Sequence, residues 1–195
     1  MKNQYSLSLD ILNKSFQDCQ EIYKNIFLIK DFISEDERLL LMSLAQDASE
    51  EDWKKDYFEH LKTTEDSDDY QWKDKSLNID LDLKTLLRDR AQESIGKDLL
   101  IREFNTIQRH YPGSSLPAHT DKAYGTLPKY ATVLYLNDDY LGGELYFSKL
   151  NLEFKFPKGS LVIFDTDDNY QHGVKEVLDG PTRYVIANFI FKEKI

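Results

Sequence analysis

The chain has 195 residues, of which 41% are hydrophobic and 13% aromatic, and it carries a formal net charge of -10. A chain of this length and apolar content can bury one sizeable core, which excludes a disordered protein and leaves little room for a second core. The acidic balance would repel a phosphate backbone, so we expect no nucleic-acid partner.

The single cysteine and the N-terminal segment indicate a soluble protein of a reducing compartment. Cys19 has no second cysteine with which to form an internal disulfide. The first ten residues lack the apolar stretch of a secretory signal, and no apolar run approaches membrane-spanning length. We therefore expect a cytoplasmic protein with no membrane partner.

A capping-box pattern marks the start of the first expected helix. Ser34 is followed by Glu37, and apolar residues then recur at helical spacing as far as Ala48. This pattern predicts a helix over about 35–48.

A second apolar stripe predicts another helix further along the chain. It runs from Leu83 to Ile95 and stops at Gly96, a usual C-terminal signal. Between the two helices lies the charged, aromatic-rich segment 53–72. We interpret this segment as a surface loop whose aromatic side chains dock on the core, with a substrate-contacting lid as the alternative.

From about residue 99 the pattern changes to short β runs separated by Gly, Pro, Asn and Asp. In one run Leu152, Phe154 and Phe156 alternate with charged residues, as in a half-buried strand. Many short strands, with helices confined to the first half, predict an α+β chain whose all-β core is a two-sheet jelly-roll barrel buttressed by helices. The expected strands are 100–111, 131–137, 144–148, 151–156, 160–165, 170–177 and 183–191.

Three residues of this second half have the composition of a metal site. His119 and Asp121 are two apart, so on an extended backbone both side chains point to one face. His172 comes from a later expected strand that the intervening strands can bring beside the first. Two imidazoles and one carboxylate are the facial ligand set of non-haem iron(II) oxygenases. Arg183 follows, and its fork of donors suits the carboxylate of an acidic co-substrate.

A succession of motifs surrounds these residues. In chain order they are R-H-Y-P-G, L-P-A-H-T-D-K, A-T-V-L-Y-L-N-D-D-Y, L-G-G-E-L-Y-F, P-K-G-S-L-V-I-F-D-T, Q-H-G-V-K-E-V and T-R-Y-V-I-A-N-F. Together they resemble the catalytic domain of the prolyl 4-hydroxylase group of Fe(II)/2-oxoglutarate dioxygenases. The earlier run N-I-F-L-I-K-D-F-I-S-E-D-E also resembles the first strand and helix of that family. The resemblance implies one dioxygenase domain over 1–195, with helical support and first strands over 1–98 and a catalytic double-stranded β-helix over 99–192.

The resemblance also implies a ligand set. Fe(II) would be held by His119, Asp121 and His172, and 2-oxoglutarate would chelate the iron while its far carboxylate meets Arg183. Dioxygen would be the second co-substrate, and the resemblance extends to ascorbate as a further ligand.

Other residues of the co-substrate pocket follow from the same resemblance. Tyr111 and Tyr135 would contact 2-oxoglutarate, and Leu145 would supply an apolar wall. We expect His110, next to Tyr111, to alternate to the other face of its strand and to have a structural role. Some relatives carry a hydroxyl residue four positions after the arginine that assists 2-oxoglutarate, whereas this chain has Ala187 there.

The implied reaction is hydroxylation of a C–H bond with release of succinate and CO2. Asp121 favours hydroxylation, because related halogenases lack this carboxylate and bind chloride in its place. Phe189 stands where nucleic-acid demethylases of the wider superfamily usually carry a second arginine.

The resemblance points to a peptidyl proline of a protein or peptide as the substrate, entering past 53–72 and the loop 122–130. Two alternatives stay open: a hydroxylase of a free amino acid or small biosynthetic intermediate, and a non-catalytic metal-binding barrel.

Overall fold

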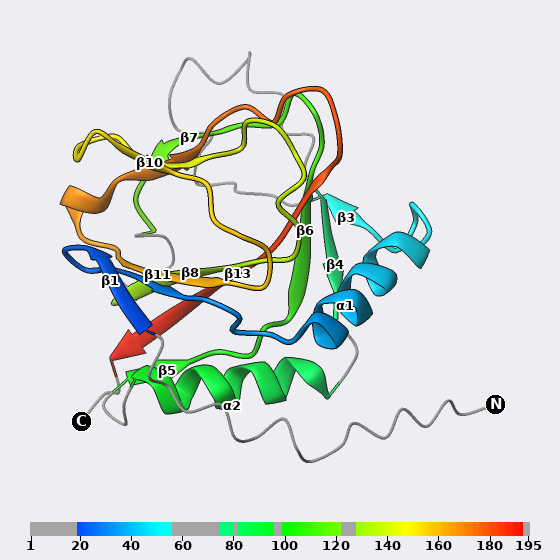
Figure 1. The fold of residues 1–195 in the computed structure, drawn as a ribbon, viewed down its shortest axis with the longest axis horizontal. Coiled ribbons are helices and arrows are strands. Elements are labelled where there is room, and N and C mark those ends of the chain that lie inside the picture. Colours follow the sequence, from blue (N-terminus) through cyan, green and yellow to red (C-terminus); the bar gives the residue numbers. More distant parts are fainter. Residues whose placement is uncertain (1–18, 56–74, 80–81, 96–98, 122–127, 193–195) are drawn as a thin grey trace.

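The computed structural model of the chain describes residues 19–55, 75–79, 82–95, 99–121 and 128–192. In these residues two β-sheets face each other, and two helices pack on the outer side of the larger sheet (Figure 1). The helices are α1 (Glu35–Asp47) and α2 (Leu83–Ile95), and a 3-10 turn, η4, covers Asp168–Tyr170. The strands are β1 (Cys19–Tyr23), β2 (Ile26–Ile29), β3 (Lys54–Lys55), β4 (Lys75–Asn78), β5 (Leu99–Ile101), β6 (Thr106–His110), β7 (Leu116–His119), β8 (Tyr130–Tyr135), β9 (Leu145–Phe147), β10 (Leu152–Phe154), β11 (Leu161–Asp165), β12 (His172–Val174) and β13 (Arg183–Lys192).

Helix α1 begins at the predicted capping box. The Glu37 backbone N–H donates to the Ser34 hydroxyl at 3.3 Å, and the Ser34 N–H donates to the Glu37 carboxylate at 2.7 Å. The helix buries Leu41 and Ala45 in the core beneath it. The predicted span of about 35–48 is therefore confirmed.

Helix α2 matches its predicted apolar stripe, because Leu83, Leu87 and Ala91 are buried. Gly96, the predicted stop, lies outside the described residues. Among the described residues, neither helix is both long and apolar enough to cross a membrane.

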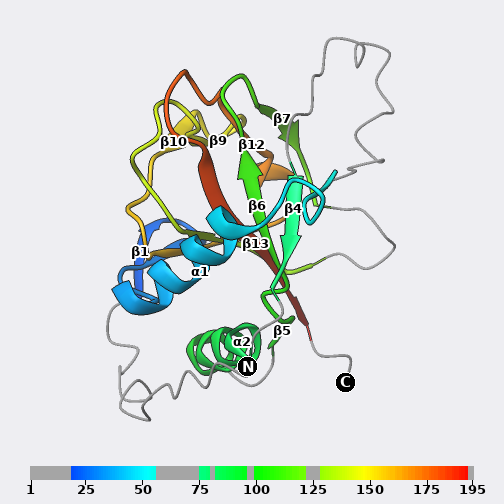
Figure 2. The same ribbon diagram turned by 90° about the vertical axis from the view of Figure 1, so that its right-hand side faces the viewer.

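The larger sheet joins both halves of the chain. Its order is β1-β2-β11-β8-β13-β6-β4-β3, with β5 paired to β13, so β2 and β4 of the first half pair with β11 and β6 of the second. The smaller sheet has the order β10-β9-β12-β7. Figure 2 shows the helices on one side of the larger sheet and the smaller sheet beyond it. Neither sheet closes on itself within the described residues.

Two apolar cores follow from the alternation of side chains along the larger sheet. On β8 and β13, Leu134 and Ile186 face the helices. The neighbouring Tyr135 and Val185 face the smaller sheet, where they pack with residues such as Phe147 of β9. This sandwich with helical support confirms the predicted jelly-roll architecture.

The strand predictions fail locally for two physical reasons. The expected strand 100–111 is split into β5 and β6, because Phe104 turns inward between them and packs on Phe32 with ring centroids 6.2 Å apart. The expected strand 170–177 is reduced to β12, because the Asp167 side chain accepts the Asn169 N–H and caps η4 instead. Most of the segment 53–72 and of the loop 122–130 lies outside the described residues.

Candidate metal and co-substrate site

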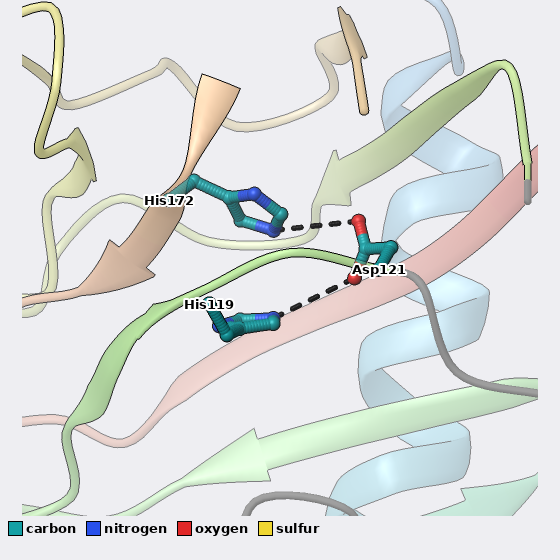
Figure 3. Close-up of side chains that lie close together, drawn as sticks. All are labelled: His119, Asp121 and His172. Atoms are coloured by element: carbon teal, nitrogen blue, oxygen red, sulfur yellow. Dashed lines mark ion pairs between the residues drawn. The ribbon is translucent and has the colours of Figure 1, made fainter. Parts of the chain in front are cut away.

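The three predicted metal ligands converge. β12 pairs with β7 so that His172 lies opposite His119, with ring centroids 4.6 Å apart. Asp121 follows β7, and its carboxylate lies 3.5 Å from His119 Nε2 and 3.6 Å from His172 Nε2 (Figure 3). One donor atom from each residue lies within 4.8 Å of the others. A single ion between them could therefore contact all three.

The backbone holds both imidazoles in the orientation that a metal requires. His119 Nδ1 lies 3.0 Å from the Pro117 carbonyl, and His172 Nδ1 lies 3.1 Å from the Tyr170 carbonyl. If each Nδ1–H donates to its carbonyl, each Nε2 presents a lone pair toward Asp121. The Tyr170 hydroxyl in turn donates to the Lys24 carbonyl at 2.8 Å, which fixes η4. These donors and their orientation fit Fe(II).

Burial keeps His172 neutral. Loss of solvent lowers the pKa of His172 from 6.5 to about 4, although the nearby Asp121 carboxylate acts in the opposite direction. At neutral pH the ring is therefore in the unprotonated form that binds a metal.

A buried guanidinium lies on the opposite sheet. Arg183, the first residue of β13, is 1% exposed, and its Nε has no hydrogen-bond partner among the described residues. Its Cζ lies 5.4 Å from the ring centroid of Tyr135 and 5.8 Å from that of Tyr140. A buried cation needs a compensating partner, so this environment fits the carboxylate of a bound ligand.

One cavity connects the two ends of the site. His119, Asp121 and His172 line it, and so does Arg183. The predicted wall residue Leu145 also lines it, and the other apolar lining residues include Ala131, Val133, Phe164, Val174, Val185 and Phe189. The cavity therefore presents a metal site and an anion site within mainly apolar walls.

The two predicted tyrosines are placed differently. Tyr135 is buried beside Arg183, although it is not among the residues that line the cavity. Tyr111 is not among the residues that line the cavity: its hydroxyl lies 3.5 Å from a Glu50 carboxylate oxygen, and its ring stacks on Arg109. The predicted contacts of Tyr111 and Tyr135 with 2-oxoglutarate both stay predictions.

The expected direction of His110 is wrong, because this residue lines the cavity. β6 pairs with β13 so that His110 lies opposite Arg183, and directly paired residues point to the same face of a sheet. The sequence shows the alternation of β6 but not which of two adjacent ring residues faces the core. Tyr140, just before the paired glycines of L-G-G-E, is not among the predicted site residues, and it lies buried near Arg183.

The family assignment agrees with this geometry. Residues 106–191 match the family model described as the 2OG-Fe(II) oxygenase superfamily. This segment is therefore similar to a 2OG-Fe(II) oxygenase domain. The family implies Fe(II), 2-oxoglutarate and O2, which confirms the predicted cofactors and the dioxygenase activity class. The predicted binding of ascorbate stays a prediction.

Solved structures share the fold of this chain. A viral collagen prolyl hydroxylase from Paramecium Bursaria Chlorella virus-1 superposes with a TM-score of 0.58 at 16% identity, covering 87% of this chain and 97% of that one. A prolyl hydroxylase from Trichoplax adhaerens, in complex with a hypoxia inducible factor oxygen degradation domain peptide fragment, gives 0.60 at 20% identity, covering 86% and 84%. A Pseudomonas putida prolyl-4-hydroxylase gives 0.60 at 19% identity, covering 87% and 93%.

At these identities the likeness concerns the fold, and it confirms the double-stranded β-helix. No curated protein sequence matches the chain significantly.

Proposed function

We propose that this oxygenase hydroxylates a peptidyl proline, with 2-oxoglutarate converted to succinate and CO2. The observation that carries the proposal is the convergence of a two-histidine, one-carboxylate cluster and a buried arginine on one apolar cavity. Fe(II), when bound, supplies the activation of dioxygen. His119, Asp121 and His172 would hold the metal, and Arg183 would bind the far carboxylate of 2-oxoglutarate.

The remaining residues of the cavity position the reactants. Tyr135 would support Arg183 at the closed end of the co-substrate site, and Leu145 would form its apolar wall. Phe164 and Phe189 would exclude water from the reacting C–H bond. The contribution of the chain is then the placement of the substrate relative to the metal rather than acid–base chemistry.

Two observations support a proline-containing peptide as the substrate. The viral neighbour is a collagen prolyl hydroxylase, and the Trichoplax adhaerens neighbour was solved with a peptide fragment. The apolar cavity walls also suit an uncharged ring better than a charged side chain. The net charge of -10 adds a preference for a peptide with basic residues, because opposite charge speeds encounter.

The test is incubation of iron-loaded protein and 2-oxoglutarate with proline-containing peptides that differ in charge, and with free L-proline. We expect a peptide to gain the mass of one oxygen faster than L-proline does, and the rate to fall as salt is raised. Asp121→Ala is the matched control and should give no mass gain. Faster hydroxylation of a free amino acid, with no salt dependence, would contradict the peptide assignment and favour a small-molecule hydroxylase. If the wild-type protein forms no succinate with any substrate, the non-catalytic barrel is the better account.

A further inference from the structure

Two buried tyrosines, Tyr135 and Tyr140, lie next to Arg183, and the proposed function assigns a role only to Tyr135. Tyr135 and Tyr140 are each 1% exposed, as is the arginine between them. Each hydroxyl lies close enough to the Arg183 guanidinium for that contact to lower its pKa, and neither has a partner of normal hydrogen-bond geometry within the described part of the chain. A buried hydroxyl without such a bond costs free energy, and a ligand that accepts from it would recover that cost.

The backbone fixes Tyr140 in this position although it belongs to no strand. The Gly143 N–H donates to the Glu176 carbonyl at 3.0 Å, and Lys155 donates to the carbonyl of Tyr140 itself. The Lys155 ammonium also lies 4.6 Å from the centroid of the Tyr140 ring. The backbone bond at Gly143 and the contacts of Lys155 therefore fix the position of Tyr140 in the absence of a bound ligand.

Gly143 allows the ring and the arginine to approach closely. A Cβ at this position would lie 3.0 Å from Cε2 of Tyr140 and 3.1 Å from Cδ of Arg183. The backbone φ of Gly143 is 65°, a left-handed conformation that glycine adopts without strain. Tyr140 and Arg183 thus pack on the same glycine and converge on one small region.

We propose that Tyr140 is a second phenol donor to the distal carboxylate of the 2-oxo acid, completing a three-point anion site with Arg183 and Tyr135. This inference rests on the proposed function. A carboxylate has two oxygens with about four lone-pair sites, enough for a guanidinium and two hydroxyls. Tyr140 would also supply a hydroxyl beside Arg183, whereas Ala187, which lines the cavity, offers none.

Both phenols are protonated at neutral pH and can donate. Burial raises the pKa of Tyr135 and of Tyr140, and the charge of Arg183 opposes the rise without cancelling it. Two neutral donors and one cation form a site for a single negative charge. The arrangement would select 2-oxo acids that carry a second carboxylate.

The test compares two ligands and two variants by anaerobic calorimetry on Fe(II)-loaded protein. The ligands are 2-oxoglutarate and 2-oxopentanoate, which has the same chain length but no distal carboxylate. Tyr140→Phe removes only the hydroxyl. Tyr184→Phe is the matched control, because Tyr184 is adjacent to Arg183 in sequence but packs on Trp53, on the other face of β13.

We expect Tyr140→Phe to weaken 2-oxoglutarate binding by about tenfold or more, to leave 2-oxopentanoate binding unchanged, and not to lower the midpoint of thermal unfolding of the ligand-free protein. Tyr184→Phe should change neither affinity. Unchanged 2-oxoglutarate binding by Tyr140→Phe would overturn the inference, and so would an equal loss for both ligands. If the wild-type protein itself does not bind 2-oxoglutarate, the proposed function fails, which is a different result from failure of Tyr140 alone.

Discussion

Two residues of the site, His172 and Arg183, are buried in surroundings that a bound metal and a bound carboxylate would complete. Burial lowers the pKa of His172, and Arg183 is buried where no carboxylate of the described residues forms an ion pair with it. Each leads to a measurable consequence.

The stability of the metal-free protein should fall as the pH is lowered from about 6.5 to 4. In this window the unfolded chain protonates His172, whereas the folded chain, with its pKa lowered to about 4, does not. Acid therefore favours the unfolded state, by an amount on the order of 3 kcal/mol over the window. Urea unfolding at several pH values measures this, and His172→Gln, which cannot titrate, should show a smaller slope. An equal slope in the two proteins would contradict the prediction.

Replacement of Arg183 should weaken 2-oxoglutarate binding. Arg183→Ala removes a charge-assisted, two-point contact in a shielded pocket, so the dissociation constant should rise more than about tenfold. Arg183→Lys should restore only part of the affinity, because an ammonium cannot match the planar fork of the guanidinium. Calorimetry under anaerobic conditions gives the constants. An unchanged constant in Arg183→Ala would remove the role assigned to this residue.

At the scale of elements, a buried ion pair ties α1 to α2. The Arg90 guanidinium donates to Glu37 at 2.8 and 3.0 Å, while Glu37 also accepts from Ser34 at the start of α1. Burial alone would raise the pKa of Glu37, but the hydrogen bonds from Arg90 and Ser34 lower it below its ordinary value. One carboxylate therefore serves as a helix cap and as the contact between two helices.

Glu37→Ala should destabilise the protein by about 3 kcal/mol, because it removes the carboxylate that pairs with the largely buried Arg90 and that accepts the Ser34 N–H in the capping box. Asp36→Ala is the control, since Asp36 is exposed in the same helical turn and should cost no more than about 0.5 kcal/mol. Urea unfolding at neutral pH compares the two. Similar losses would show that Glu37 acts only through the charge of the first helical turn.

Elements with strong local signals could be predicted from the sequence, and those set by tertiary contacts could not. The capping box and the apolar stripes gave α1 and α2 almost to the residue. The break between β5 and β6 depends on Phe104 packing on Phe32, a residue far away in the chain. The direction of His110 depends on the register of β6 against β13.

The candidate site divides in the same way. His119, Asp121, His172 and Arg183 could be found because the chemistry of a metal and a carboxylate restricts residue type and order. Tyr140 could not, because its position depends on how the turn at Gly143 folds back onto Arg183.

For the whole molecule, the site depends on the packing of the two sheets. His119 and His172 belong to β7 and β12 of the smaller sheet, and Asp121 follows β7 by two residues. Arg183 and Tyr135 belong to β13 and β8 of the larger sheet. A 2-oxo acid that bridges metal and arginine would therefore hold the two sheets together.

Metal and 2-oxoglutarate should accordingly raise the unfolding midpoint together. At concentrations about 100 times its dissociation constant, each ligand should add roughly 2.7 kcal/mol of stability. Thermal unfolding without oxygen measures the shifts. In Arg183→Ala the metal should still raise the unfolding midpoint, whereas 2-oxoglutarate should add no further rise. If neither ligand raises the midpoint of this variant, the division of the site between the two sheets is contradicted.

The central claim is that His119, Asp121 and His172 together hold one iron. Elemental analysis of protein loaded with Fe(II) without oxygen, and then desalted, tests this directly. We predict one iron per wild-type chain and essentially none in the variant with all three residues changed to alanine. Stoichiometric iron retained by the triple variant would contradict the assignment of the site.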